Sequence, residues 1–198
     1  IARDAMAGGL DVICDKPLAT NLEDALDLVQ RVKESGLVFC LTHNYTGYPM
    51  VRHARAMVQR GELGPIRQLH VEYIQGNLAA PTEADRDPAA NWRFSTELCG
   101  ASLVLGDIGA HAHHLASFIT GPELTEVAAE LGSVLPGRQV HDYGHLLLRF
   151  EGGARGSMWV TNSAAGAEHG LHIRVFGDKG GLEWHQEEPN RLLHRPLG

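Results

Sequence analysis

Hydrophobic residues in the first part of the chain follow two different periods. Residues 10–14 (LDVIC) and 37–42 (LVFCLT) are short and mostly apolar, as buried strands are. Between them, apolar residues recur at helical intervals, just after Thr20 and Glu23 at the spacing of a capping box. The helical positions are Leu22, Ala25, Leu26, Val29 and Val32. This order predicts a βαβ unit whose parallel strands are covered on both faces.

The pattern changes in the remainder of the chain. A helix over residues 50–58 and an alternating strand over 66–74 precede a long irregular stretch, residues 75–105. A second helix is expected from about Asp107 to Thr120. Further strands are expected at residues 124–135, 143–150, 154–161, 171–177 and 181–186. A change from α/β to mainly antiparallel character is typical of a boundary between two domains.

Composition and charge narrow the class of protein. The 198 residues contain 24 acidic and 17 basic side chains, a net charge of −7, which argues against a nucleic-acid-binding protein. With 43% hydrophobic and 21% charged residues, the chain has the apolar content of a globular protein. These residues contain neither an apolar run of about 20 nor a signal-peptide pattern, so we expect no membrane partner and a cytoplasmic protein.

The three cysteines do not form a recognisable site. Cys14, Cys40 and Cys99 are too widely spaced for a disulfide framework or a Cys-x-x-Cys metal site. Cys14 and Cys40 lie in the apolar strands, where we expect them to be buried free thiols. The candidate chemistry therefore lies with the ionisable side chains.

The first candidate site is Asp15-Lys16-Pro17, at the carboxyl end of the first apolar strand. Ligands of open α/β sheets bind just outside that end. Pro17 favours an extended chain, so that Lys16 projects from the strand edge, where partial desolvation would lower its pKa and allow proton transfer. The alternative is a solvated lysine at the end of a strand.

The second candidate is a group of three residues on the second predicted helix. Asp107, His111 and His114 are spaced i, i+4 and i+7, which places them on one helical face. A carboxylate one turn before an imidazole can orient it, fix its tautomer and raise its basicity, as a general acid/base histidine requires. Two alternatives remain open: a helix-dipole role for Asp107 with histidines that merely pack, or a metal site. Because no HExxH motif or second ligand cluster accompanies these residues, we expect no metal.

Two further pairs of residues lie in predicted loops. Trp92 and Arg93 offer an apolar wall and a guanidinium that can bind phosphate, carboxylate or hydroxyl oxygens. Asn44 and Tyr45 follow the second strand, at a position suited to ligand contact. Each pair is also compatible with an ordinary structural role. The other histidines show no mutual spacing that indicates a site: His43, His53, His70, His141, His145, His169, His172, His185 and His194.

Taken together, several stretches resemble the Gfo/Idh/MocA family of NAD(P)-dependent oxidoreductases. They are DKPLA from residue 15, HNYTGYP from 43, VRHARAMVQRGELGPI from 51, NWRF from 91, GDIGAHAHHLASFITG from 106 and RVFGDKGGLEW from 174. The resemblance implies an α/β unit followed by an α+β unit. Residues 1–47 would be the C-terminal part of a Rossmann domain, and residues 48–198 an α+β domain with a large, mainly antiparallel open sheet.

The same resemblance implies roles for the candidate residues. Lys16 would be the catalytic lysine with Asp107 and His111 as catalytic partners, and either Lys16 or His111 would be the principal base. These three residues and His114 would contact the substrate. The contacts to NAD or NADP would come from Asp15, Lys16, Asn44, Trp92 and Arg93.

One departure from the family pattern concerns the phosphate-binding loop. The glycine-rich loop that opens a Rossmann domain is absent from these residues, and we expect a piece of a longer oxidoreductase that is inactive alone and incomplete at its C-terminal end. The whole enzyme would transfer hydride between a nicotinamide and a secondary alcohol or ketone of a sugar, sugar derivative or polyol. We expect homo-oligomers formed through the C-terminal domain sheet. The alternatives are an NAD-dependent glycosidase on the same fold and a non-catalytic dinucleotide or sugar sensor.

Overall fold

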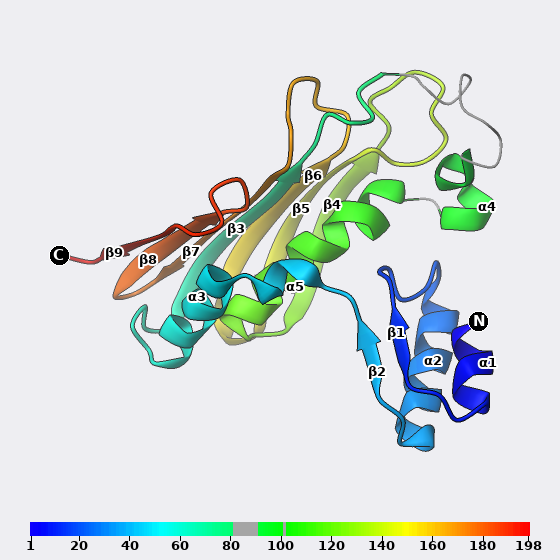
Figure 1. Ribbon diagram of the computed structural model, residues 1–198. Coiled ribbons are helices and arrows are strands. Elements are labelled where there is room, and N and C mark those ends of the chain that lie inside the picture. The colour runs from blue at the N-terminus through cyan, green and yellow to red at the C-terminus, as the bar shows by residue number, and fades with distance from the viewer. Residues whose placement is uncertain (81–90, 101) are drawn as a thin grey trace.

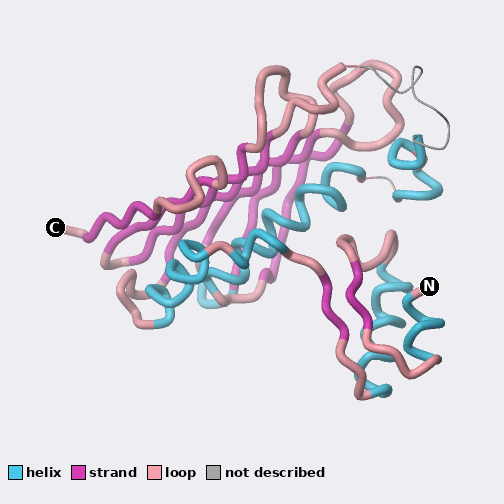
Figure 2. The backbone as a smooth tube through the Cα atoms, in the orientation of Figure 1, coloured by secondary structure: helices cyan, strands magenta, loops and turns pink. Residues whose placement is uncertain are grey.

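The chain folds into a small α/β unit and a larger unit built on a broad sheet (Figures 1 and 2). The computed structural model describes residues 1–80, 91–100 and 102–198, so part of the irregular stretch predicted over 75–105 lies outside the described residues. The N-terminus lies in the small unit, and the C-terminus lies at the far end of the sheet (Figure 1).

The small unit contains the predicted βαβ element, preceded by a short helix. Its elements are α1 (Ala2–Ala7), β1 (Val12–Cys14), α2 (Leu22–Ser35) and β2 (Phe39–Leu41). The two strands pair in parallel, with Ile13 opposite Cys40, which confirms the predicted unit. The helix α2 ends at Gly36, whose left-handed backbone (φ 68°) is a conformation that glycine adopts without steric cost.

The start of α2 differs from the predicted capping box. Asn21 is the N-cap: its Oδ1 accepts a hydrogen bond from the Asp24 backbone N–H at 2.8 Å, and its Nδ2 donates to the Asp24 carboxylate at 2.8 Å. The box assigned to Thr20 and Glu23 was therefore wrong by one residue. The amide of asparagine can accept and donate at once, so it closes the first turn with Asp24 alone.

The prediction that both strand cysteines are buried was also wrong. Cys40 is exposed and Cys14 is only half-buried. Figure 1 shows α1 and α2 on the same side of the strand pair. The opposite side is open, so the expectation that both faces of the strands are covered was wrong for these residues, and Ile13 on that side is 80% exposed. Because Cys40 lies opposite Ile13, it shares the uncovered face, whereas Cys14 points to the other one.

The second unit is built on a seven-stranded sheet. Its strands are β3 (Ile66–Ile74), β4 (Leu124–Gly132), β5 (Tyr143–Phe150), β6 (Arg155–Thr161), β7 (Gly170–Gly177), β8 (Gly180–His185) and β9 (Leu192–Pro196). The spatial order is β4-β5-β6-β3-β7-β8-β9, and every adjacent pair is antiparallel except β3 with β6. This confirms the large, mainly antiparallel sheet. The strand β9 was not predicted, because its residues do not alternate between apolar and polar.

Helices cover one face of this sheet and leave the other face open (Figure 1). The covering helices are η1 (Asn44–Gly47), α3 (Pro49–Gln59), η3 (Leu105–Gly109) and α5 (Ala110–Thr120). The short helices η2 (Asn91–Phe94) and α4 (Thr96–Cys99) lie apart from the sheet, and η4 (Glu151–Gly153) forms the turn between β5 and β6. Side chains of β3 alternate accordingly. Leu69, Val71 and Tyr73 are buried in the core shared with α3 and α5, whereas His70 and Glu72 point to the outer face. Within the described ranges, no helix is long and apolar enough to cross a membrane.

The helix predicted over residues 107–120 begins with a π turn. In η3 the backbone has the wider π-helical spacing, and the Ala110 N–H bonds to the Leu105 carbonyl five residues earlier. The turn continues directly into α5. Single π turns within α-helices occur frequently at functional sites, and this one contains Asp107.

The position of α5 depends on apolar side chains that it buries against the sheet. Leu115 on α5 is fully buried, at 0% exposure. Truncation in Leu115→Ala should lower the free energy of unfolding by about 2–5 kcal/mol, because it removes buried methyl groups and leaves a cavity. Urea denaturation followed by tryptophan fluorescence would measure the loss. The matched control is Leu197→Ala at a leucine 77% exposed, which should change stability by less than about 0.5 kcal/mol. Equal losses of stability in the two variants would contradict the buried position of Leu115 against the sheet.

Candidate active site

A cleft of about 700 Å³ is lined by residues of both units. The small unit contributes the segment after β1 together with Thr42 and Asn44 from the segment after β2. The larger unit contributes η2, α4 and the turn that opens α5. The predicted site residues that line this cleft are Asp15, Lys16, Asn44, Trp92, Arg93, Asp107 and His111. His114 does not line it.

Lys16 and Asp107 form an ion pair within the cleft. Lys16 Nζ lies 2.8 Å from Asp107 Oδ1 and donates a second hydrogen bond to the Asp107 backbone carbonyl at 2.5 Å. The Lys16–Pro17 peptide bond that follows is cis. A lysine ammonium has three N–H donors, and Asp107 takes two of them. Among the described contacts, one donor of Lys16 is therefore left for an oxygen atom in the cleft.

Asp15 is held by a threonine that the sequence did not single out. Thr42 Oγ1 donates a hydrogen bond to Asp15 Oδ1 at 2.8 Å. The two residues follow adjacent parallel strands, whose carboxyl ends meet at one edge of the sheet. Like Asp15 after β1, Thr42 lies just after β2, so its position in the sequence also marks it as a candidate.

His111 is the most enclosed of the predicted catalytic residues. It is 7% exposed, and its ring meets the edge of the Tyr45 ring at 4.8 Å between centroids. Burial lowers the pKa of His111 to about 4, and the positive charge of Lys16 contributes to the shift. The imidazole is therefore neutral at neutral pH and can accept a proton. Among the described residues, no hydrogen bond joins Asp107 to His111, since the Asp107 carboxylate faces Lys16 instead.

His114 lies beside a different histidine. Its ring stacks on that of His43, with 3.9 Å between centroids and 16° between planes. Burial lowers the pKa of His114 to about 4, with smaller contributions from His43 and His113. His43 is therefore a half-buried partner of this helix, although its place in the sequence did not indicate one. The Nδ1 atom of His43 is buried without a hydrogen-bond partner in the described part of the chain.

A chain of polar contacts runs from the neighbourhood of His111 across the sheet. The Tyr45 and Tyr73 hydroxyls lie 2.6 Å apart, and Gln75 Nε2 donates to the Tyr73 hydroxyl at 3.1 Å. The same amide nitrogen lies 2.8 Å from His169 Nδ1. Burial and the contact with Tyr45 raise the pKa of Tyr73 above its usual value, so Tyr73 stays protonated. Of these residues, only Tyr45 is a candidate from the sequence. The other three lie far from Tyr45 along the chain, so their spacing does not indicate that they meet it.

Trp92 and Arg93 lie on η2 at the edge of the cleft. The Arg93 guanidinium lies over the Trp92 indole, 5.4 Å from the ring centroid, and the indole is half exposed. Cys99 Sγ donates to the Trp92 carbonyl at 3.2 Å, which ties η2 to α4. The pair thus presents a flat apolar surface and a cation toward the cleft.

Two family descriptions match the chain. "Oxidoreductase family, NAD-binding Rossmann fold" matches residues 1–45, and "GFO/IDH/MocA C-terminal domain" matches residues 51–183. The chain belongs to the Gfo/Idh/MocA family. The family fold, a Rossmann-type α/β unit followed by a large mixed sheet, is the one predicted from the sequence.

Several relatives share this fold over the entire chain. YfiI, an uncharacterised oxidoreductase of Bacillus subtilis, is 30% identical over 100% of this chain and 51% of its own. The structure of an inositol dehydrogenase homologue with NAD⁺ from Azotobacter vinelandii matches with a TM-score of 0.94 and 36% identity, over 100% of this chain and 51% of that one. A levoglucosan dehydrogenase in complex with NADH and levoglucosan matches with a TM-score of 0.91 and 28% identity, over 100% and 53%. The chain spans about half the length of these relatives.

The charge of Lys16 should have a measurable effect on the pKa of His111. In Lys16→Met the pKa of His111 should rise above its value of about 4, because a positive charge that disfavours imidazolium is removed. It should stay below 6.5, because burial remains the larger cause. Histidine NMR titration of the full-length protein would measure the shift, with the His111 signal assigned from a His111→Asn variant. Lys33→Met, at an exposed lysine on α2, is the control. An unchanged His111 pKa in Lys16→Met would contradict the geometry.

Proposed function

We propose that the protein containing this chain is an NAD(P)-dependent dehydrogenase that acts on a secondary alcohol of a sugar, sugar derivative or polyol, or on the corresponding ketone. The observation that carries the proposal is the meeting of Lys16, Asp107 and His111 in one cleft, although Lys16 and Asp107 are 91 residues apart in sequence. Relatives named as an inositol dehydrogenase homologue and a levoglucosan dehydrogenase support the substrate class.

The residues of the cleft suit the reactive end of a nicotinamide cofactor. The volume of about 700 Å³ falls within the range of small-molecule sites, about 300–1,000 Å³. Asp15 and Asn44 supply polar groups for a ribose or an amide, whereas Trp92 and Arg93 supply an apolar wall and a cation. With Lys16, they would hold NAD or NADP. When bound, the cofactor accepts a hydride from the alcohol or returns it to the ketone.

Lys16 and His111 would divide the remaining work on the reacting oxygen. The free N–H of Lys16 Nζ donates to that oxygen and stabilises the negative charge that develops on it. An imidazole nitrogen of His111 accepts the hydroxyl proton during oxidation and returns it during reduction. Asp107 holds Lys16 in place through its carboxylate and its backbone carbonyl. His114 is not part of this proposal, because its ring stacks on His43 outside the cleft.

The charge balance of the cleft favours an uncharged substrate. The Lys16 ammonium and the Asp107 carboxylate offset each other, and His111 is neutral. A polyhydroxylated compound can exchange hydrogen bonds with all three groups without leaving a buried charge unpaired. We therefore propose a neutral sugar or polyol as the substrate.

The larger organisation of the protein is also a proposal. We propose domains at residues 1–47 and 48–198, a cytoplasmic enzyme, and self-association through the outer face of the sheet. The exposed apolar residues Leu147 and Phe176 on that face support association. Sedimentation velocity of the full-length protein would test it, and a monomer at all concentrations would contradict it.

Substitution of the proposed base or of the proposed catalytic lysine should slow turnover strongly. His111→Asn and Lys16→Met should each lower kcat by about 10²–10⁴-fold, because each removes a proton-transfer or charge-stabilising group. The assay would follow NADH or NADPH absorbance with a panel of polyols and sugars and the full-length enzyme. His113→Asn is the matched control, since this exposed neighbour on α5 does not line the cleft and should retain activity.

Other outcomes of the same assay would favour the alternatives. Release of a sugar from a glycoside without net reduction of the cofactor would indicate an NAD-dependent glycosidase. Binding of a dinucleotide or sugar without turnover of any substrate would indicate a sensor. Full activity in His111→Asn would contradict the role of His111, even if the enzyme is a dehydrogenase.

A further inference from the structure

A group of ionisable side chains lies on the outer face of the sheet, away from α3 and α5. Strand pairing places His172 of β7 opposite Glu72 of β3 on one side and opposite His185 of β8 on the other. Glu183 precedes His185 by two residues on β8 and therefore points to the same face. The proposed dehydrogenase chemistry uses none of these residues.

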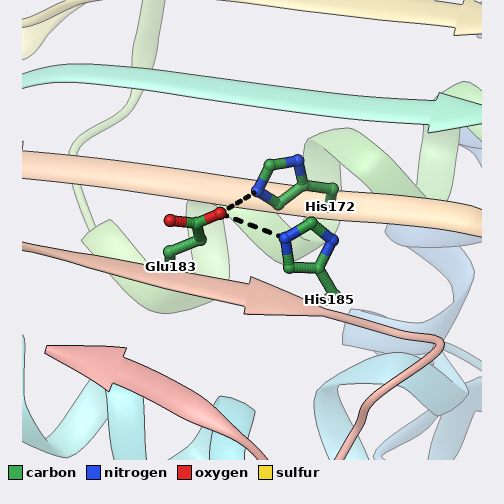
Figure 3. Close-up of side chains that lie close together, drawn as sticks. All are labelled: His172, Glu183 and His185. Carbon is green, nitrogen blue, oxygen red and sulfur yellow. Dashed lines mark hydrogen bonds and ion pairs between the residues drawn. The ribbon is translucent and has the colours of Figure 1, made fainter.

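Three of these side chains converge on one point (Figure 3). His172 Nε2 and His185 Nε2 lie 3.2 Å and 3.1 Å from the same atom, Glu183 Oε1. One ligand atom from each residue lies within 4.8 Å of the others. In a tetrahedral zinc site with bonds of about 2.0–2.2 Å, ligand atoms are roughly 3.3–3.6 Å apart. The two separations from Glu183 Oε1 are thus close to those between ligands of a single ion, and the two imidazole nitrogens lie within 4.8 Å of each other.

The environment of His172 points independently to a ligand. His172 is 8% exposed, and its Nε2 is buried without a hydrogen-bond partner among the described residues. Glu183 Oε1 lies within ion-pair distance of that nitrogen but outside hydrogen-bonding geometry. A buried polar atom left in this state costs free energy that a bound ligand would recover.

We propose that His172, Glu183 and His185 bind a divalent transition-metal ion, with Zn²⁺ as the best match. Two imidazoles and one carboxylate form the ligand set of three-residue zinc sites that keep a fourth position for water. In the single chain the His185 side chain is 47% exposed, so the fourth position is open to water. Mg²⁺ and Ca²⁺ fit less well, because they prefer oxygen ligands.

Neighbouring residues prepare the three ligands for an ion. Glu72 Oε1 lies 3.3 Å from His172 Nδ1, and a proton held between these atoms leaves Nε2 as the metal-binding nitrogen. His70 lies 3.1 Å from the other oxygen of Glu72. Arg195 donates to Glu183 Oε2 at 2.9 Å, which leaves Oε1 for the ion. This contact is the main reason that the pKa of Glu183 falls to about 2, so the carboxylate is ionised at neutral pH.

Other charged side chains surround the site on the same face. The carboxylates of Glu72 and Glu183 are offset by the guanidinium of Arg195 and by that of Arg174, which lies opposite Glu183 in the β7–β8 pairing. With neutral imidazoles these charges sum to zero, so the affinity for an ion depends on the ligand atoms rather than on net charge.

Binding requires the two rings to rotate. His172 and His185 stack with 3.6 Å between centroids and 14° between planes, so their nitrogen lone pairs must rotate to meet at one ion. His185 lies at the end of β8 and is exposed, which leaves it free to turn. The ion would link β7 to β8 on the face opposite the helices, so we expect it to stabilise the sheet without taking part in catalysis.

Metal titration of the full-length protein tests the proposal. After treatment with EDTA, the protein should bind about one Zn²⁺ per chain by calorimetry, and saturation should raise Tm. His185→Gln should weaken binding by at least about tenfold and remove the Tm shift, while the metal-free protein keeps its fold because His185 is exposed. His145→Gln, at another exposed histidine on the outer face, is the control and should bind as the unmodified protein does. The value of kcat should be the same with and without Zn²⁺.

Several results would overturn the proposal. They are the absence of saturable binding, equal affinity in His185→Gln and the unmodified protein, or Zn²⁺ binding that is lost in His111→Asn and retained in His185→Gln. The spectroscopic check uses Cu²⁺ as a probe of the same site. An electron paramagnetic resonance spectrum with two coordinated imidazole nitrogens would support the ligand set, and one with fewer would contradict it.

Discussion

The ion pair between Lys16 and Asp107 joins the two units of the protein at the cleft. Lys16 follows β1 of the small unit, whereas Asp107 lies in the π turn ahead of α5, which is buried against the sheet. Because both side chains are partly exposed, the pair contributes only about 0–1 kcal/mol to stability. The pair matters because it fixes the position of Lys16. The ammonium bonds to both the carboxylate and the backbone carbonyl of Asp107. Any movement between the two units would therefore displace Lys16 from the site.

The same contact contributes to the electrostatics around His111. Burial has the larger effect on the pKa of this histidine, and the Lys16 charge adds to it, so a neutral imidazole lies near a cation. This combination suits a reaction that moves a proton to nitrogen while negative charge develops on oxygen. The outer face of the sheet that supports α5 carries the cluster of His172, Glu183 and His185, which we propose as a separate metal site.

Much of the architecture was predictable because it depends on local patterns. Helical periodicity in α2 and α3, apolar runs in β1 and β2, and alternation in β3 each follow from neighbouring residues. The strand-end position of Lys16 and the spacing of Asp107 and His111 likewise identified the residues that line the cleft. The N-cap at Asn21 and the exposure of Cys40 were missed, because they depend on which side chain closes a turn and which face a helix covers.

The sequence by itself determined the order of most elements, the fold family and the candidate residues of the cleft. Only the tertiary structure decided which of these residues touch. It directed Asp107 to Lys16 and placed His114 against His43. It also gathered Glu72, His172, Glu183 and His185 from three strands into one cluster. Spacing along a helix is set by local geometry, whereas proximity across paired strands depends on a register that the whole sheet establishes.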